Sequence, residues 1–546
     1  MIQGLSRKFK QLQADPVLRA WLIGRAFGKW PSAPNFAPHQ PPYLAGQLPL
    51  MSETPSDLGD IKTCEVKSLS PSIDIPLPGE TITLSPDDPS ALFNRSFHDI
   101  ETELGAHRFA WLDTPISQID TDWTSALWNA WVSKFGDNQT GWAWHPYTAT
   151  ERAINIINFA AHHGWPSEAD STRTLLAAHA PIIARQLEYF GEHDTSNHLA
   201  NNGRGLFIIG ATLGLPRATQ MGMDILIHEA ARIFTPGGIL REGSSHYHAL
   251  YARRYAECAA LAHKHDIDGA DTLNDIASRA MKVLSHLHLP GGLPLIGDIS
   301  PDIAPSDLQA MMEITSSPDA LNADGWLRVD QHDWHGLWHC APDGWSQMPG
   351  HGHQDVGSFE LHWKNDRVIV DPGRGAYGED GDAALYRSSD VHNGLIINGH
   401  DPYPPNKPYY TPAFRQSVCG PTPSLSPTET GAQLHFDGYQ RLGKIGTVTR
   451  QWIFNKNKAT IHDSVDGKGH VQICRQFITP LTTTITGDSV ILAGSDASFR
   501  IHGATHPTLQ PITIWHAYGQ GQPGTVIAFN NGSPLPWQGD LMIEVI

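Results

Sequence analysis

The sequence predicts a chain of two parts, a helical region followed by an all-β region. From about Asn94 to Ser316, apolar residues recur at helical spacing in segments rich in alanine and leucine. After about Trp326 the apolar segments become short and β-branched, and glycine, proline, aspartate or asparagine bounds them. This spacing is typical of antiparallel strands in a sandwich. A chain of 546 residues with 40% hydrophobic and 17% charged residues is long enough and apolar enough to fold as two large domains.

The first 30 residues are basic, with six lysines and arginines against one aspartate, although the whole chain has a net charge of −18. Apolar residues are interleaved among these charges, so we expect an amphipathic helix. One interpretation is a helix packed on the body of the protein, and the other is a helix in peripheral contact with an anionic membrane surface. The segment lacks the apolar core and cleavage site of a secretory signal. A proline-rich stretch at 31–49 then predicts a semi-rigid extended connector.

The overall charge excludes some partners. With 38 basic against 56 acidic residues, the chain lacks the basic surface that nucleic-acid binding requires. The same charge disfavours a long, densely sulfated polymer as substrate. No run of 18 apolar residues suggests a transmembrane span. The five cysteines are widely spaced and odd in number, which favours a reducing compartment and hence the cytoplasm.

Two clusters in the helical region lie at predicted helix starts. Asn197 and His198 directly precede the apolar run LANNGRGLFIIGATLG, so Ser196 or Asn197 is the expected N-cap. Free backbone N–H groups and the helix dipole favour an anion at such a position. The alternative is simple capping with a surface histidine.

The second helix-start cluster is EGSSHYH at 242–248, with Ser245 as the expected N-cap and Tyr247 in the first turn. A positive helix end lowers the cost of ionising a tyrosine, which would suit Tyr247 to proton transfer. The alternative is that Tyr247 and Tyr251, four residues apart, are packing residues.

The β region carries two further clusters. In the segment GHGHQD, His351 and His353 share one face of an extended chain and therefore address one site. Asp371, in DPG, and His392, in RSSDVHN, follow at later predicted strand ends. Together with His353 they provide a set of ligands suited to zinc with one position open. A hydrogen-bonded network of strand-end side chains explains the same residues equally well.

Taken together, these motifs resemble the heparinase II/III-like polysaccharide lyases, which include related alginate and oligoalginate lyases. The resemblance rests on Asn197-His198 with Asn202, on E-x-S-x-x-Y-H from Glu242, and on HGHQD, VDPG and RSSDVHN in the same order. It implies an incomplete (α/α) toroid followed by an antiparallel β-sandwich, with the active site between them. We therefore expect an N-terminal segment and connector at 1–93, the toroid at 94–325 and the β-sandwich at 326–546.

The resemblance also implies roles for single residues. Asn197 and His198 would bind and neutralise a uronate carboxylate, Tyr247 would be the catalytic tyrosine, and His351 would be its partner from the β domain. His353, Asp371 and His392 would bind zinc. Some relatives have a glutamate at the position of Asn201. The expected substrate-binding residues are Asn201, Arg204, Glu242 and Arg387.

The implied activity is β-elimination on an acidic, uronate-containing oligo- or polysaccharide. One alternative is a glycoside hydrolase on the same scaffold, which needs two carboxylates across the scissile bond; Asp355, Glu360 and Asp371 are the candidates. The other alternative is a non-catalytic glycan-binding protein of the same fold. The resemblance points to the periplasm or cell envelope, in contrast to the cysteine pattern. The sequence does not indicate an oligomeric state.

Overall fold

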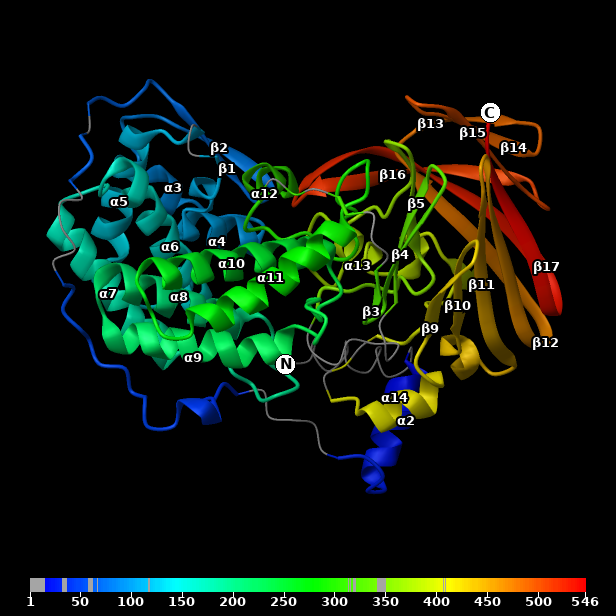
Figure 1. Cartoon of the computed structure of the whole chain (residues 1–546), viewed down its shortest axis with the longest axis horizontal. Coiled ribbons are helices and arrows are strands. Elements are labelled where there is room, and N and C mark those ends of the chain that lie inside the picture. The colour runs from blue at the N-terminus through cyan, green and yellow to red at the C-terminus, as the bar shows by residue number, and fades with distance from the viewer. Residues whose placement is uncertain are drawn as a thin grey trace.

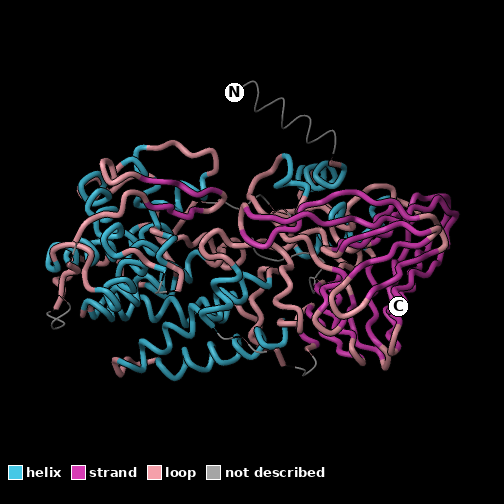
Figure 2. The backbone as a smooth tube through the Cα atoms, turned by 90° about the horizontal axis from the view of Figure 1, so that it is seen from above, coloured by secondary structure: helices cyan, strands magenta, loops and turns pink. Residues whose placement is uncertain are grey.

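The computed structural model describes residues 15–31, 37–56, 62–65, 67–115, 118–312, 314, 316–317, 321–340, 350–405, 407 and 409–546. Helices form one half of an elongated molecule and strands form the other half (Figures 1 and 2). This arrangement agrees with the predicted fold class, a helical domain followed by an antiparallel β domain.

The helical half is built from helices that succeed one another along the chain. Neighbouring helices such as α8 and α9, or α10 and α11, pack side by side. The helices are α3 (Ala91–Asn94), α4 (Ile100–Arg108), α5 (Thr121–Phe135), α6 (Pro146–His163), α7 (Ala169–Arg185), α8 (His198–Leu213), α9 (Pro216–Ile233), α10 (Ser245–Lys264), α11 (Ala270–Leu287) and α12 (Pro305–Met312).

Glycines fix the position of α8 between its neighbours. A Cβ atom on Gly205 would lie 2.5 Å from Oγ1 of Thr150 in α6, and one on Gly222 of α9 would lie 2.3 Å from the backbone nitrogen of Phe207. Only glycine allows helices to approach this closely without a clash. The apolar run that predicted α8 is therefore buried on nearly every side, and the start of α8 is held rigidly.

The β half contains two antiparallel sheets within the described residues. The smaller sheet has the order β3-β4-β5-β6-β7, and the larger one has the order β13-β14-β15-β17-β12-β11-β10-β9, with β8 paired to β12 and β16 to β17. The strands of the smaller sheet are β3 (Asn322–Ala323), β4 (Trp326–Gln331), β5 (Trp334–His339), β6 (Phe359–Trp363) and β7 (Asp366–Ile369). Those of the larger sheet are β8 (Leu395–Ile397), β9 (Ser424–Thr428), β10 (Gly431–Phe436), β11 (Ile445–Asn455), β12 (Lys458–Thr479), β13 (Thr482–Thr486), β14 (Ser489–Ala493), β15 (Ser498–Gly503), β16 (Pro507–Ala517) and β17 (Gln520–Val545).

The two sheets share one hydrophobic core. Trp338 of the smaller sheet contacts Trp452 of the larger one, with ring centroids 5.4 Å apart. Along β12, residues 458–465 alternate between half-buried and buried positions, as expected for a strand with one face in a core. The packing of one sheet on the other confirms the sandwich that the strand spacing predicted.

The N-terminal basic segment is described only from Asp15 onward, and residues 1–14 lie outside the described part. Helix α2 (Pro16–Ala26) packs on the β domain beside α14 (Pro412–Cys419), as Figure 1 shows. Trp21 is buried there against Tyr409, at a centroid distance of 4.5 Å. In this part of the segment, the interpretation of a helix packed on the protein is supported; membrane contact stays a prediction.

The described part of the proline-rich connector packs on the helical domain. Leu44 and Leu50 are buried in the core of that domain, and Tyr43 stacks on His228 of α9 with ring centroids 4.3 Å apart. The connector is thus fixed to the helical domain by side-chain packing. After it, β1 (Ile73–Leu77) and β2 (Glu80–Leu84) form a separate hairpin.

The five cysteines form no disulfide bonds, and three of them, Cys258, Cys340 and Cys419, are buried. No helix in the described part of the chain combines the length and apolar character that crossing a membrane requires.

Candidate active site

Three helix N-termini meet where the helical domain faces the β domain. Asn197 is the N-cap of α8, and the hydroxyl of Tyr251, from α10, lies 2.9 Å from its Oδ1. Tyr147, in the first turn of α6, contacts the ring of His198, in the first turn of α8, with centroids 4.7 Å apart. The unpaired N–H groups and dipoles of these helix ends favour negative charge in the space between them.

Glu242 positions Asn197. The backbone N–H of Asn197 donates to Oε1 of Glu242 at 2.9 Å, and Nδ2 of Asn197 donates to Oε2. The Glu242 side chain is fully buried. The sequence suggested Glu242 as a substrate-binding residue, but in the structure its carboxylate orients the amide of Asn197 and does not face an open space.

Tyr247 and His351 come together from the two domains. Their rings stack with centroids 3.6 Å apart and planes 7° apart, and the Tyr247 hydroxyl lies 2.6 Å from that of Tyr377. Burial, and after it the Asp302 carboxylate, raise the pKa of Tyr247 well above its ordinary value. The expectation that the helix end would ease its ionisation is therefore wrong, because burial outweighs the helix dipole.

The start of α10 also differs slightly from the sequence expectation. Ser244, and not Ser245, is the N-cap, since its Oγ accepts a hydrogen bond from the backbone N–H of Tyr247 at 3.1 Å. The Ser245 hydroxyl instead accepts from the backbone N–H of Ile296 at 3.1 Å. Both contacts fix the first turn of α10 and thus the ring of Tyr247.

The loop that carries His351 is tied to the helical domain through its backbone. The His351 N–H donates to the Glu242 carbonyl at 2.7 Å, and the Asp298 N–H donates to the His351 carbonyl at 2.8 Å. Glycine is required at this junction, because a Cβ on Gly297 would lie 2.4 Å from the Gly243 carbonyl oxygen. Gly297 also has a φ of +79°. These contacts make the two-domain site one continuous structure.

Asp298 holds both histidines of the HGH segment. Its Oδ2 lies 3.1 Å from Nδ1 of His351, its Oδ1 lies 2.8 Å from Nε2 of His353, and Arg374 Nη1 donates to Oδ1 at 2.9 Å. Burial alone would raise the pKa of Asp298, but the hydrogen bonds from His351 and His353 hold it well below its ordinary value. The two histidines that were expected to address one site therefore share Asp298 as a hydrogen-bond partner.

His198 is held by a carboxylate from another loop. Its Nδ1 lies 2.8 Å from Oε1 of Glu188, whose Oε2 accepts from Nδ2 of Asn202 at 3.1 Å. Although burial lowers the pKa of His198, Glu188 outweighs it and the pKa is raised. Since 44% of the His198 side chain is exposed, one edge of its ring is accessible at the surface.

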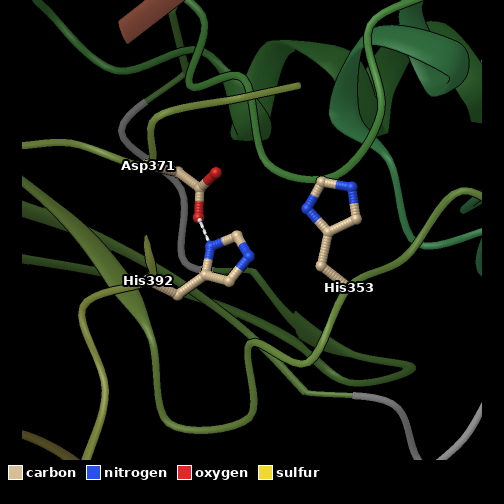
Figure 3. Close-up of side chains that lie close together, drawn as sticks. All are labelled: His353, Asp371 and His392. Carbon is tan, nitrogen blue, oxygen red and sulfur yellow. Dashed lines mark hydrogen bonds and ion pairs between the residues drawn. The ribbon is translucent and has the colours of Figure 1, made fainter. Parts of the chain in front are cut away.

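The three residues suggested as metal ligands converge (Figure 3). One ligand atom from each of His353, Asp371 and His392 lies within 4.8 Å of the others. Nδ1 of His353 and Nε2 of His392 are buried and have no hydrogen-bond partner within the described ranges. His392 Nδ1 lies 2.8 Å from Oδ2 of Asp371, and Asp298 fixes the opposite nitrogen of His353. Two unpartnered ring nitrogens beside a carboxylate are a donor set that could hold a metal ion.

Asn201, Arg204 and Arg387, suggested for substrate binding, do not join this group. Asn201 is fully buried inside α8, and Arg204 is buried with Nη1 at 3.1 Å from Glu151 and Nη2 at 3.4 Å from Glu257. Arg387 is 42% exposed and pairs with Glu379 at 3.2 Å. The helical turn carries Asn201 and Arg204 into the protein interior, where Nη1 of Arg204 also lies 3.4 Å from Oδ1 of Asn201.

The carboxylates considered for a hydrolase are all buried. Glu360 is fully buried between His362 and Arg367, at 2.9 and 3.1 Å, and Asp355 lies 3.5 Å from His339. Asp371 belongs to the candidate metal site. None of the three is accessible to flank a glycosidic bond, so the structure disfavours the hydrolase alternative.

Asp298, Tyr377 and Glu188 lie near the site but were not identified from the sequence, and Tyr251 was considered only as a packing residue. Asp298 follows an apolar run in LPLIGD, and Tyr377 lies in a glycine-rich turn six residues after Asp371. The positions of Asp298 and Tyr377 directly after such segments were the available sequence signal for a site residue. Neither position is specific, because the side chains that Asp298 and Tyr377 contact lie far away along the chain.

Comparison with known families identifies the β domain. Residues 313–530 match the family model described as "Heparinase II/III-like, C-terminal". No curated protein sequence shows a significant match to the chain.

Solved structures resemble the chain over both domains. A heparinase III crystal structure matches with a TM-score of 0.62 at 15% identity, covering 83% of this chain and 79% of that one. A second heparinase III structure gives 0.57 at 15% identity, with 84% and 83% covered. A mutant of the heparan sulfate lyase from Pedobacter heparinus gives 0.53 at 16% identity, with 83% and 78% covered. Residues 313–530 therefore match the heparinase II/III-like C-terminal family model, and 83% of the chain shares the fold of the heparinase III structure, a helical domain followed by an antiparallel β domain.

Proposed function

We propose that the protein is a polysaccharide lyase that cleaves a uronate-containing oligo- or polysaccharide by β-elimination. The observation that carries the proposal is the stack of Tyr247 on His351, which joins groups from both domains at 3.6 Å beside Asn197. The family match and the fold support an activity of this class.

The reaction needs three contributions. The proton on C5 of the uronate leaves, the C4–O4 bond breaks as a double bond forms between C4 and C5, and O4 takes up a proton. Because the C5 proton lies next to a carboxylate, it is very weakly acidic until that negative charge is neutralised. Preorganised donors at the carboxylate stabilise the enolate-like charge that develops.

His198 and Asn197 suit the neutralising role. The Glu188 contact at Nδ1 leaves Nε2 of His198 as the edge that meets a substrate, and the raised pKa favours a protonated ring. The Asn197 amide is held in place by Glu242 and Tyr251. Both donors are therefore positioned before the substrate arrives.

Tyr247 and His351 suit the two proton transfers. Asp298 at Nδ1 of His351 favours a proton on that nitrogen, which leaves Nε2 to accept the C5 proton. The raised pKa of Tyr247 keeps its phenol protonated, so this hydroxyl supplies the proton to O4. The Tyr377 hydroxyl lies 2.6 Å from the Tyr247 hydroxyl, and the hydrogen bond between them holds the Tyr247 hydroxyl in position. The resemblance implied only that Tyr247 is the catalytic tyrosine; its burial argues for the acid role.

We further propose that His353, Asp371 and His392 bind zinc. The two unpartnered nitrogens support this assignment. Zinc there would supply a cross-link that stabilises the strand-end loops. His353 is two residues from His351 and shares Asp298 with it, so fixing one histidine also fixes the other.

The test of the activity is a panel of uronate polymers and oligomers of the heparan, chondroitin and alginate types, read by ultraviolet absorbance. A lyase generates an absorbing unsaturated uronate at the new end. We expect absorbance to rise with at least one member of the panel and not with Tyr247→Phe. Binding without any rise over many hours would instead support the glycan-binding alternative.

A further inference from the structure

An exposed tryptophan lies near the candidate active site. Half of Trp142 is exposed, and it is the only tryptophan among the described residues that is exposed to this extent. An indole combines a large apolar face with a polar N–H group, so a rigidly held tryptophan suits a ligand that offers both kinds of surface.

The backbone around Trp142 is fixed by its neighbours. Gly141 has a φ of +70° and leads into a 3₁₀ turn at Trp142–Trp144. Trp144, two residues on, is buried; its Nε1 donates to the Phe135 carbonyl at 2.8 Å, and the Arg152 guanidinium lies 4.9 Å from its ring. The indole of Trp142 is therefore presented to solvent from an anchored turn, so little conformational freedom is lost on binding.

A strip of partly exposed rings connects Trp142 to the reaction site. The ring of His145 lies 5.5 Å from that of Trp142, and its Nε2 lies 3.7 Å from Oε1 of Glu188. The same oxygen lies 2.8 Å from Nδ1 of His198. One third of the His145 side chain is exposed. Glu188 thus joins the two histidines, and His198 directly follows Asn197, whose Nδ2 lies 3.5 Å from Nε2 of His351.

We propose that Trp142 and His145 form a sugar-binding subsite for a unit of the substrate outside the pair that flanks the scissile bond. This inference rests on the proposed lyase function and names a further part of its binding surface. The flat, partly apolar face of a pyranose ring matches an exposed indole, and the neighbouring imidazole hydrogen-bonds a sugar hydroxyl. A chain bound with its uronate at His198 would extend along the strip to Trp142.

The test compares Trp142→Ala with the wild type on an unsulfated heparan-type disaccharide and hexasaccharide and on the matching alginate oligomers. Loss of the indole should raise KM for the hexasaccharide roughly 3- to 10-fold, the range expected for one aromatic contact. The value of kcat and the KM for the disaccharide should stay unchanged. Trp142→Phe, which keeps a ring, should show a smaller effect.

Phe27→Ala is the matched control. Phe27 is 84% exposed, and it follows α2 on the β domain, so its loss removes exposed aromatic surface without touching the strip. Calorimetric titration of the hexasaccharide into Tyr247→Phe, with and without Trp142→Ala, measures binding apart from turnover. Equal hexasaccharide affinity and KM with and without Trp142 would overturn the subsite, even if the lyase activity is present. Weaker binding after the Trp142 change, in a protein that cleaves no uronate oligomer, would uphold the subsite and overturn the lyase assignment.

Discussion

The helical and β sides of the candidate site differ in how completely their polar groups are paired. On the helical side, Asn197 is held by Glu242 and Tyr251, and Nδ1 of His198 is paired with Glu188. On the β side, Nδ1 of His353 and Nε2 of His392 are buried without a partner. The groups that hold Asn197 and His198 are thus supplied by the helical domain itself, whereas Nδ1 of His353 and Nε2 of His392 have no hydrogen-bond partner among the described residues.

This difference in pairing separates residues that act on the substrate from residues that also contribute to stability. Buried polar groups without partners are costly, so two such nitrogens beside Asp371 favour a bound ion over an empty network. On the helical side, the donors Asn197 and His198 act on a bound substrate and not on an ion. We accordingly expect changes on the helical side to affect turnover or substrate affinity, and changes at the candidate metal residues to affect stability as well.

The largest expected effect comes from Tyr247→Phe, which keeps the stacked ring and removes the hydroxyl. We predict a fall in kcat of at least about 10²-fold, the low end for loss of an acid–base group. Tyr255→Phe is the control, since Tyr255 lies on the same helix and bonds the Leu226 carbonyl away from the site. Steady-state kinetics by absorbance would decide, and near-native turnover in Tyr247→Phe would refute the role of Tyr247.

The second prediction addresses the metal. Elemental analysis should find close to one zinc per chain, lost in His392→Ala and Asp371→Ala. Removing the ion should lower Tm by roughly 5 °C or more, because a ligand at a hundredfold excess over its Kd adds about 2.7 kcal/mol, and a domain of this size shifts about 2–4 °C per kcal/mol. The surface variant His462→Ala should keep both zinc and Tm. Unchanged Tm and activity in a metal-free protein would contradict the assignment.

The sequence predicted the helices and strands of the two domains better than the side-chain contacts at the candidate site. Periodicity separated helices from strands, and the motifs selected Asn197, Tyr247 and His351, which do meet. Glu188 and Asp298 were missed, because a carboxylate that pairs with a distant histidine leaves no local pattern. Arg204 was misassigned, since the sequence does not show that Glu151 and Glu257 already bind its guanidinium.

A smaller effect is expected from Glu188→Gln. The raised pKa of His198 means that its protonated form, which binds a carboxylate, prevails at lower pH and is lost as pH rises through that pKa. Glu188 and Glu242 favour this form, and Arg108 opposes it. Removing the Glu188 charge should move the alkaline rise in KM to lower pH and raise KM at neutral pH up to about tenfold.

Two measurements check the Glu188 prediction. The His198 ring signal, followed by NMR, should titrate at lower pH in Glu188→Gln even without substrate. Glu192→Gln, an exposed neighbour that bonds Tyr189, should leave both the titration and KM as in the wild type. An unchanged His198 titration in Glu188→Gln would show that Glu188 does not raise the pKa of His198 and would contradict this prediction.

The smallest expected effect concerns salt. A net charge of −18 repels a polyanion at long range, and salt screens this repulsion over about 8 Å at physiological strength. Moderate salt should therefore raise the rate on a long sulfated polymer about two- to threefold, whereas the rate on a trisaccharide should barely change. A preference for full-length heparin at low salt would contradict this expectation.

The central claim is that the groups meeting between the two domains break a sugar chain by elimination and not by hydrolysis. The most direct measurement is cleavage of a uronate oligosaccharide in oxygen-18-labelled water, with the products read by mass spectrometry. An elimination adds no water across the broken bond, so we predict one unsaturated uronate end and products whose combined mass equals that of the substrate, apart from the oxygen that free reducing ends exchange with the solvent. Products that carry the label and have gained a water molecule would show hydrolysis and would contradict the account.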